Sequence, residues 1–157
     1  MNTMTIHLGN DQTVVDVDAR QHIIPLGVVN LTRAELTSDP PRPEELTNAI
    51  GLVVDHLDDV RREIPAAAEA DEVVVVGDMA IAIAAIEVGV TPSLPLSLSR
   101  TAVEDVFRTV ATESSTERAL NPGLPADAVD TIVAACCIVV AVMRHLHLDV
   151  VDVESRS

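Results

Sequence analysis

The pattern of apolar and polar residues near the N-terminus predicts three short strands. Residues 5–8, 13–17 and 22–26 are rich in β-branched and aliphatic side chains, and short clusters containing glycine, asparagine or aspartate separate them. Runs of this length joined by turn residues are typical of an antiparallel meander. We therefore expect the chain to begin as a small antiparallel sheet.

Apolar residues further along the chain recur every three or four positions, which predicts helices. The clearest stripe follows Pro43 and consists of Leu46, Ile50, Val53, Val54, Leu57, Val60 and Ile64. Shorter helices are predicted within residues 26–36, over 79–88 and after Ser99, whose hydroxyl can cap a helix start. Residues 126–146 are apolar almost all round, so we expect one long helix at the centre of the domain.

Four consecutive valines, at positions 73–76, predict a central strand covered on both faces. Gly77 and a helix follow, and in many proteins the N–H groups at such a corner hold a phosphate. Here Asp78 places a carboxylate where an anion would bind. With a last strand over 149–153, the element order predicts a single α/β domain, with a mixed sheet that starts as the antiparallel meander and has helices on both faces.

Composition narrows the possible partners of this domain. The 157 residues carry 25 acidic and 10 basic side chains, all of the latter arginine, and the formal net charge is −15. This surplus repels nucleic-acid backbones and anionic membranes, and Phe107 is the one aromatic residue available for stacking on bases. We therefore expect no nucleic-acid partner and no membrane partner.

The two cysteines and the length of the apolar runs indicate the cellular compartment in which the chain is expected. Cys136 and Cys137 are adjacent in an apolar run, so we expect them reduced and buried, which fits the cytoplasm. The longest apolar run, residues 132–143, is too short to span a bilayer, and the first residues show no secretory pattern. The histidines lack zinc-like spacing, so we expect no metal site built from them.

Five short motifs occur in one order along the chain. They are residues 25–33 with 39–41, residues 75–77 with 84–86, residues 98–104, residues 122–125 with 128–135, and residues 142–146. In this order the chain resembles the exopolyphosphatase/guanosine-pentaphosphate phosphohydrolase (Ppx/GppA) family over residues 6–155. The resemblance covers the second half of the family's catalytic core, so residues 1–157 are expected to be one domain of the actin-like, ribonuclease-H type.

The resemblance implies an activity that needs more than this half. In the family, two such domains face each other across a cleft and hydrolyse a terminal phosphoryl group of polyphosphate or guanosine pentaphosphate with magnesium. The first domain, which supplies one phosphate loop and the glutamate that acts on water, is absent from the sequence. In the family a further helix after the last strand covers the sheet. An uncovered sheet commonly marks an interface, so we expect a homodimer or a partner protein.

The family's phosphate loops are degenerate in this chain. The best placement of the first loop is residues 7–14, where Gly9 and Thr13 survive and Asn10, Asp11 and Gln12 replace the other loop residues. His7 stands where the family has an aspartate associated with the metal, and imidazole is a poor ligand for magnesium. These residues form either a working anion loop or a simple hairpin turn.

The second family loop is Gly77-Asp78-Met79 in this sequence. A carboxylate about 4 Å from a phosphate oxygen costs roughly 4 kcal/mol at an effective dielectric constant of 20, about a thousandfold in affinity. Asp78 can instead cap its own helix. Alternatively, Asp11 and Asp78 share a magnesium ion, which would turn two obstructing acids into ligands.

We therefore expect no catalytic residue to function in this chain by itself. The favoured interpretation is a Ppx/GppA phosphatase-like domain that lacks autonomous catalysis and acts as an interaction or ligand-sensing module, with a phosphate-containing small ligand as a candidate. The alternative is an exopolyphosphatase or guanosine-pentaphosphate phosphohydrolase, completed by a dimer or partner domain with magnesium.

Overall fold

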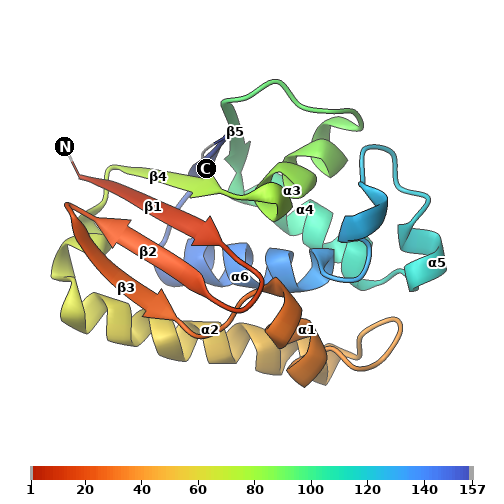
Figure 1. The fold of residues 1–157 in the computed structure, drawn as a ribbon, viewed down its shortest axis with the longest axis horizontal. Helices are drawn as coiled ribbons and strands as arrows, with labels where there is room; N and C mark the ends of the chain where they lie inside the picture. Colours follow the sequence, from red (N-terminus) through yellow and green to blue (C-terminus); the bar gives the residue numbers. More distant parts are fainter. Residues whose placement is uncertain (1, 156–157) are drawn as a thin grey trace.

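Six strands form one mixed sheet in the order β3-β2-β1-β4-β6-β5 in a computed structural model that describes residues 2–155 (Figure 1). The strands are β1 Thr3–Leu8, β2 Thr13–Val17, β3 Arg20–Ile24, β4 Glu72–Val76, β5 Leu96–Ser99 and β6 Val150–Glu154. The helices are α1 Val28–Glu35, α2 Pro43–Glu63, α3 Asp78–Val88, α4 Arg100–Ala111, α5 Ser115–Arg118 and α6 Ile132–His145, with 3-10 turns η1 Pro65–Glu69 and η2 Ala126–Ala128.

The predicted meander is confirmed, because β1, β2 and β3 pair antiparallel in chain order. The third strand begins at Arg20, two residues earlier than the sequence predicts. Asp18 and Ala19 both have positive φ, so a two-residue turn reverses the chain and pairs Val17 directly with Arg20. β1 also pairs in parallel with β4, which places the meander beside the four valines.

The helices lie on one face of the sheet. The connections from β3 to β4 and from β4 to β6 step in the same direction across the sheet, and right-handed crossovers then put their helices on the same face. α6 contacts α1, α2, α3 and α4, and Figure 1 shows it passing behind the strands. Within residues 2–155, the helix layer that the sequence predicts on the second face is therefore not found.

The core is aliphatic and centred on α6. Every residue from Ile132 to Met143 is buried, as expected for the apolar run.

Two elements differ from the sequence prediction. The single helix predicted over 126–146 starts too early, because η2 and a turn precede Thr131, the N-cap of α6. β5, a four-residue edge strand paired antiparallel with β6, is not predicted by the residue pattern. Among the described residues, we find no helix long and apolar enough to cross a membrane.

Candidate functional site

Gly77 forms the corner where β4 passes into α3. β1 and β4 are parallel, so Leu8 and Gly77 follow the paired residues His7 and Val76 at the same end of the sheet. Gly77 has φ of +116°, and a Cβ built there would lie 2.8 Å from the carbonyl oxygen of Leu8. Both facts require glycine, so the corner in the sequence is a real feature of the backbone.

The β1–β2 turn is joined to the start of α1 by its backbone. The Gly9 N–H donates to the Gln12 carbonyl at 3.0 Å and closes the turn. The Val28 N–H then donates to the Gly9 carbonyl at 2.9 Å, and the Val29 N–H donates to the Asn10 carbonyl at 2.8 Å. The first N–H groups of α1 therefore bond the turn and are occupied.

Side chains strengthen this junction. Asn30 accepts a hydrogen bond from the Gly27 N–H at 2.7 Å and donates to the Asp11 carbonyl at 2.9 Å. Gly27 allows the close approach, since a Cβ there would lie 2.4 Å from the Asn10 carbonyl carbon. Thr13 is buried and donates to the Leu26 carbonyl. The turn is thus a closed hairpin turn, held against a helix.

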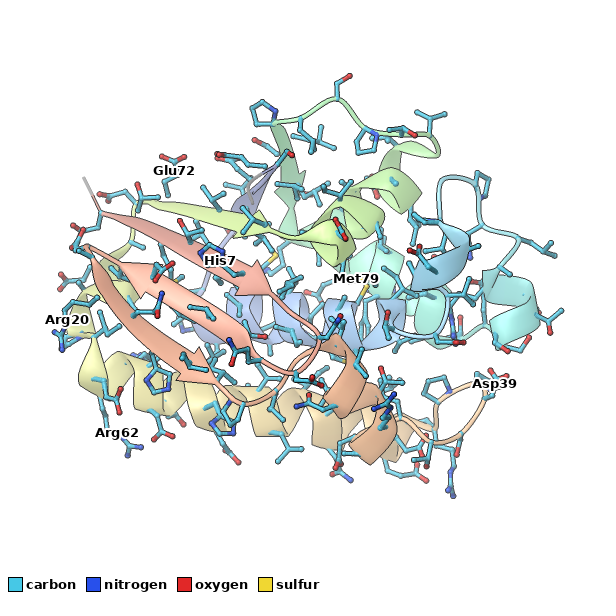
Figure 2. The ribbon with its side chains drawn as sticks, in the orientation of Figure 1. His7, Arg20, Asp39, Arg62, Glu72 and Met79 are labelled. Atoms are coloured by element: carbon cyan, nitrogen blue, oxygen red, sulfur yellow. The ribbon has the colours of Figure 1, made fainter. Side chains whose placement is uncertain are left out.

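A groove of about 550 Å³ lies beside this junction. It is lined by residues from the turn, from the starts of α1 and α3, and from residues 125–131, namely Asn10, Val29, Asp78, Met79, Ile81, Pro125, Asp127, Ala128 and Thr131. The Thr131 hydroxyl lies 3.6 Å from the sulfur of Met79. Figure 2 shows Met79 near the start of α6, apart from His7 on the strands.

Asp78 lines this groove with an exposed side chain. The expectation that it caps its own helix is wrong, because Gly77 is the N-cap of α3 and Asp78 is the first helical residue, and no side-chain capping bond is formed. One residue inside the helix, a carboxylate still interacts favourably with the helix dipole. Its oxygens are therefore directed to the groove and to solvent.

The other residues of the degenerate loops do not gather around Asp78. Asp11 is exposed in the turn and does not line the groove, whereas Asn10 does. His7 lies on the sheet, 2.7 Å from the Asp16 carboxylate. Within residues 2–155, no cluster of three or more histidine, cysteine, aspartate or glutamate residues could hold a metal ion.

The groove is acidic, and sequence reasoning missed part of its lining. Its polar side chains are Asn10, Asp78, Asp127 and Thr131, so it holds two carboxylates and no basic side chain. Asp127 and Thr131 follow the turn motif at 122–125, which is the one local signal that could have pointed to them. Their approach to Asp78 depends on the packing of α3 against α6.

The two cysteines are free and buried in α6, as predicted. Burial raises the pKa of both thiols, that of Cys137 to about 12. A thiol held neutral in this way is a poor nucleophile, so neither cysteine is a catalytic candidate.

Comparison with known proteins identifies the family. The model of the Ppx/GppA phosphatase family matches residues 8–156. The chain belongs to this family. None of the curated proteins compared with the chain matches it.

Solved structures of Ppx/GppA proteins share its fold. The Aquifex aeolicus Ppx/GppA phosphatase, type II variant, is 20% identical with a TM-score of 0.83, and the match covers 98% of this chain and 53% of that chain. An exopolyphosphatase from Cytophaga hutchinsonii is 13% identical with a TM-score of 0.78, covering 99% and 54%. An exopolyphosphatase-like protein reaches a TM-score of 0.88 at 18% identity, covering 98% and 55%.

These matches confirm the predicted actin-like α/β fold of the Ppx/GppA domain. The chain spans about half the length of the solved structures that it matches.

Proposed function

We propose that this Ppx/GppA-family domain binds a ligand or partner and does not hydrolyse phosphoric anhydrides by itself. The observation that carries the proposal is the groove at Asp78 and Asp127, which has two carboxylates and no basic side chain. At about 4 Å each carboxylate opposes a phosphate charge by roughly 4 kcal/mol at an effective dielectric constant of 20. A groove of this kind disfavours an unaccompanied phosphate.

The β1–β2 turn supports the same proposal. A phosphate loop works by aiming unpaired backbone N–H groups at the ligand. Here the carbonyls of Gly9, Asn10 and Asp11 hold α1 and Asn30, and the helix amides that could attract an anion are used in those bonds. The free, buried cysteines favour a reducing compartment, so we place this function in the cytoplasm.

A second candidate is a phosphohydrolase assembled from two parts. We take the chain to correspond to the second half of the family core, on the order of its sequence motifs; its match covers about half of the solved structures. A second copy or a partner domain would supply the first half. A magnesium ion at Asp78 would neutralise this acid and bind phosphate oxygens, because magnesium prefers oxygen ligands. Asp11, the other expected ligand, does not line the groove and would reach this ion only if the β1–β2 turn moved towards Asp78.

Phosphate release tests the proposed lack of catalysis by the chain alone. The purified chain is incubated with polyphosphate or guanosine pentaphosphate and millimolar magnesium, alongside Asp78→Ala and the control Glu87→Gln, which changes an exposed acid on the same helix. We expect no release from any of them. Release by the chain and by Glu87→Gln, abolished in Asp78→Ala, would overturn the favoured proposal.

Magnesium binding tests the second candidate directly. Calorimetry with magnesium chloride is run on the chain and on the double variant Asp11→Asn/Asp78→Asn. Binding heat that is lost in the double variant supports the two-part hydrolase. If magnesium produces no binding heat, the chain does not bind magnesium at Asp11 and Asp78, and the second candidate loses its metal site.

A further inference from the structure

A second pocket, of about 250 Å³, lies between the loop that joins α1 to α2, the start of α5 and the start of α6. Figure 2 shows Asp39, one of its lining residues, on this loop. Among the described residues, the pocket and the groove at Asp78 share no lining residue. We call it the Asp39 pocket. It is smaller than the sites that usually hold drug-sized molecules, so it suits a ligand of few atoms.

The hydroxyl groups of the Asp39 pocket can accept hydrogen bonds but have no hydrogen left to donate. Four hydroxyl side chains line the pocket, and each donates its hydrogen to another protein group. The acceptors are the Glu45 carboxylate for Thr37 and Ser38, the Asp39 carboxylate for Ser115, and the Val28 carbonyl for Thr32, at 2.6–3.2 Å. A hydroxyl that already donates its hydrogen offers a ligand only the lone pairs of its oxygen.

Carboxylates outnumber the guanidinium of Arg118 around the pocket. Asp39 and Asp130 line it, and Glu45 is the buried acceptor of two of its hydroxyl groups. The Ser115 hydroxyl lowers the pKa of the Asp39 carboxyl, and the Arg42 N–H is the largest cause that lowers the pKa of Glu45 to about 2. Both groups are therefore charged at neutral pH, and the surroundings of the pocket favour a cation.

Arg118 contributes positive charge to the lining, but its nitrogens are engaged elsewhere. The side chain is 4% exposed. Its Nε, Nη1 and Nη2 atoms donate to the carbonyls of Val110, Val129 and Glu113 at 2.9–3.1 Å. The guanidinium is thus used to hold the ends of α4 and the start of α6 together. An anion in the pocket would meet two carboxylates before it found a free donor.

The lining therefore favours a cation that donates hydrogen bonds. An ammonium group has one positive charge and three N–H donors. Leu36, Pro41 and Val133 complete the lining with apolar surface, which a short hydrocarbon chain can cover. We propose that the Asp39 pocket binds a small aliphatic primary amine, with its ammonium group held by Asp39, Asp130 and the hydroxyl oxygens. This site is independent of the function proposed for the groove at Asp78.

A titration followed by NMR tests the proposal. Butylammonium chloride is added to the ¹⁵N-labelled chain, and the amide signals of Ser38, Asp39 and Ser115 should move and reach saturation. Butanol and sodium butyrate, which have the same chain without the ammonium group, should leave these signals in place, as should sodium chloride at matched ionic strength. The proposal is overturned if the amine moves none of these signals, or if a control compound moves them equally.

A matched pair of variants locates the charge that binds the amine. Asp130→Asn removes an exposed carboxylate of the lining and should weaken binding about three- to tenfold. Asp127→Asn makes the same change at an exposed acid three residues earlier, which lines the groove at Asp78 instead, and should leave the affinity unchanged. Circular dichroism confirms that both variants are folded. Equal weakening in the two variants would mean long-range attraction only and would overturn the site.

Chain length and the position of the shifts complete the test. Methylammonium should bind severalfold more weakly than butylammonium, because it leaves the apolar part of the lining uncovered. Equal affinities would overturn the assignment of an aliphatic ligand. Shifts confined to Asp78 and Asp127 would move the amine to the other groove and overturn the proposal. Phosphate release by the chain would refute the proposed lack of catalysis and leave these binding results unchanged.

Discussion

Asp39 accepts two hydrogen bonds from Ser115, one from the backbone N–H and one from the hydroxyl, each at 2.8 Å, across 76 positions of sequence. The contact fastens the loop between α1 and α2 to the start of α5. The hydrogen bond from the Ser115 hydroxyl is the largest cause that holds the pKa of the Asp39 carboxyl below the ordinary value of 3.8, and the bond from the Ser115 N–H is the second. The carboxylate form is therefore favoured by folding.

We expect Asp39→Asn to lower stability at neutral pH, because an amide presents one acceptor where the carboxylate presents two. A lowered pKa contributes stability above 3.8 that disappears as the pH falls through the folded value. The gap between wild type and variant should therefore close in acid. Urea unfolding at pH 7 and pH 3 measures it, with Asp105→Asn as a surface control; an equal gap at both pH values would contradict the expectation.

Glu45 should make the stability of the protein depend on pH over a wider acid range than Asp39 does. It is buried at the third position of α2 and accepts from the Arg42 N–H at 2.9 Å and from the Thr37 hydroxyl at 2.9 Å. The Arg42 N–H is the largest cause that lowers its pKa, from 4.5 to about 2. Its contribution to stability is complete above pH 4.5 and lost as the pH falls towards 2.

Glu45→Gln should therefore be less stable than wild type at pH 6 and should lose less stability than wild type between pH 4.5 and pH 2.5. Urea midpoints across this range test the expectation. The exposed neighbour Glu44 provides the matched control as Glu44→Gln. Parallel pH profiles for wild type and Glu45→Gln would count against the assigned role.

Two glycines should respond oppositely to alanine. Gly77→Ala forces a side chain into a positive-φ backbone and against the Leu8 carbonyl, which should cost roughly 1–3 kcal/mol or more. Gly51 lies inside α2, and a Cβ added there would meet nothing within 4 Å, so Gly51→Ala should stabilise by about 0.5–1 kcal/mol. Free energies of unfolding in urea compare them, and stabilisation by Gly77→Ala would be incompatible with a corner that requires glycine.

Arg118 should be intolerant even of lysine. The side chain is 4% exposed and donates to the carbonyls of Val110, Val129 and Glu113. Lysine lacks the planar guanidinium group that donates to all three carbonyls at once. Arg118→Lys should therefore lower the free energy of unfolding by about 2–3 kcal/mol. Arg108→Lys on the exposed face of α4 is the control. Thermal and urea unfolding give the comparison, and similar stabilities for the two variants would refute it.

The sequence correctly predicted several features that depend on neighbouring residues. The Ser99 hydroxyl caps α4, and Gly77 begins the strand-to-helix corner. Each involves residues within a few positions of one another, so residue type and spacing are enough to predict it. The family motifs are also short stretches of neighbouring residues, and the fold class was predicted from them and from the order of elements.

Features that join distant segments were decided by tertiary structure. The sequence predicted helices on both faces of the sheet, but the direction of successive crossovers places those of residues 2–155 on one face. Asp127 joins Asp78 in the groove because α3 packs on α6. Periodicity records which residues are buried, whereas the partner that buries them is set by contacts between segments far apart in the chain.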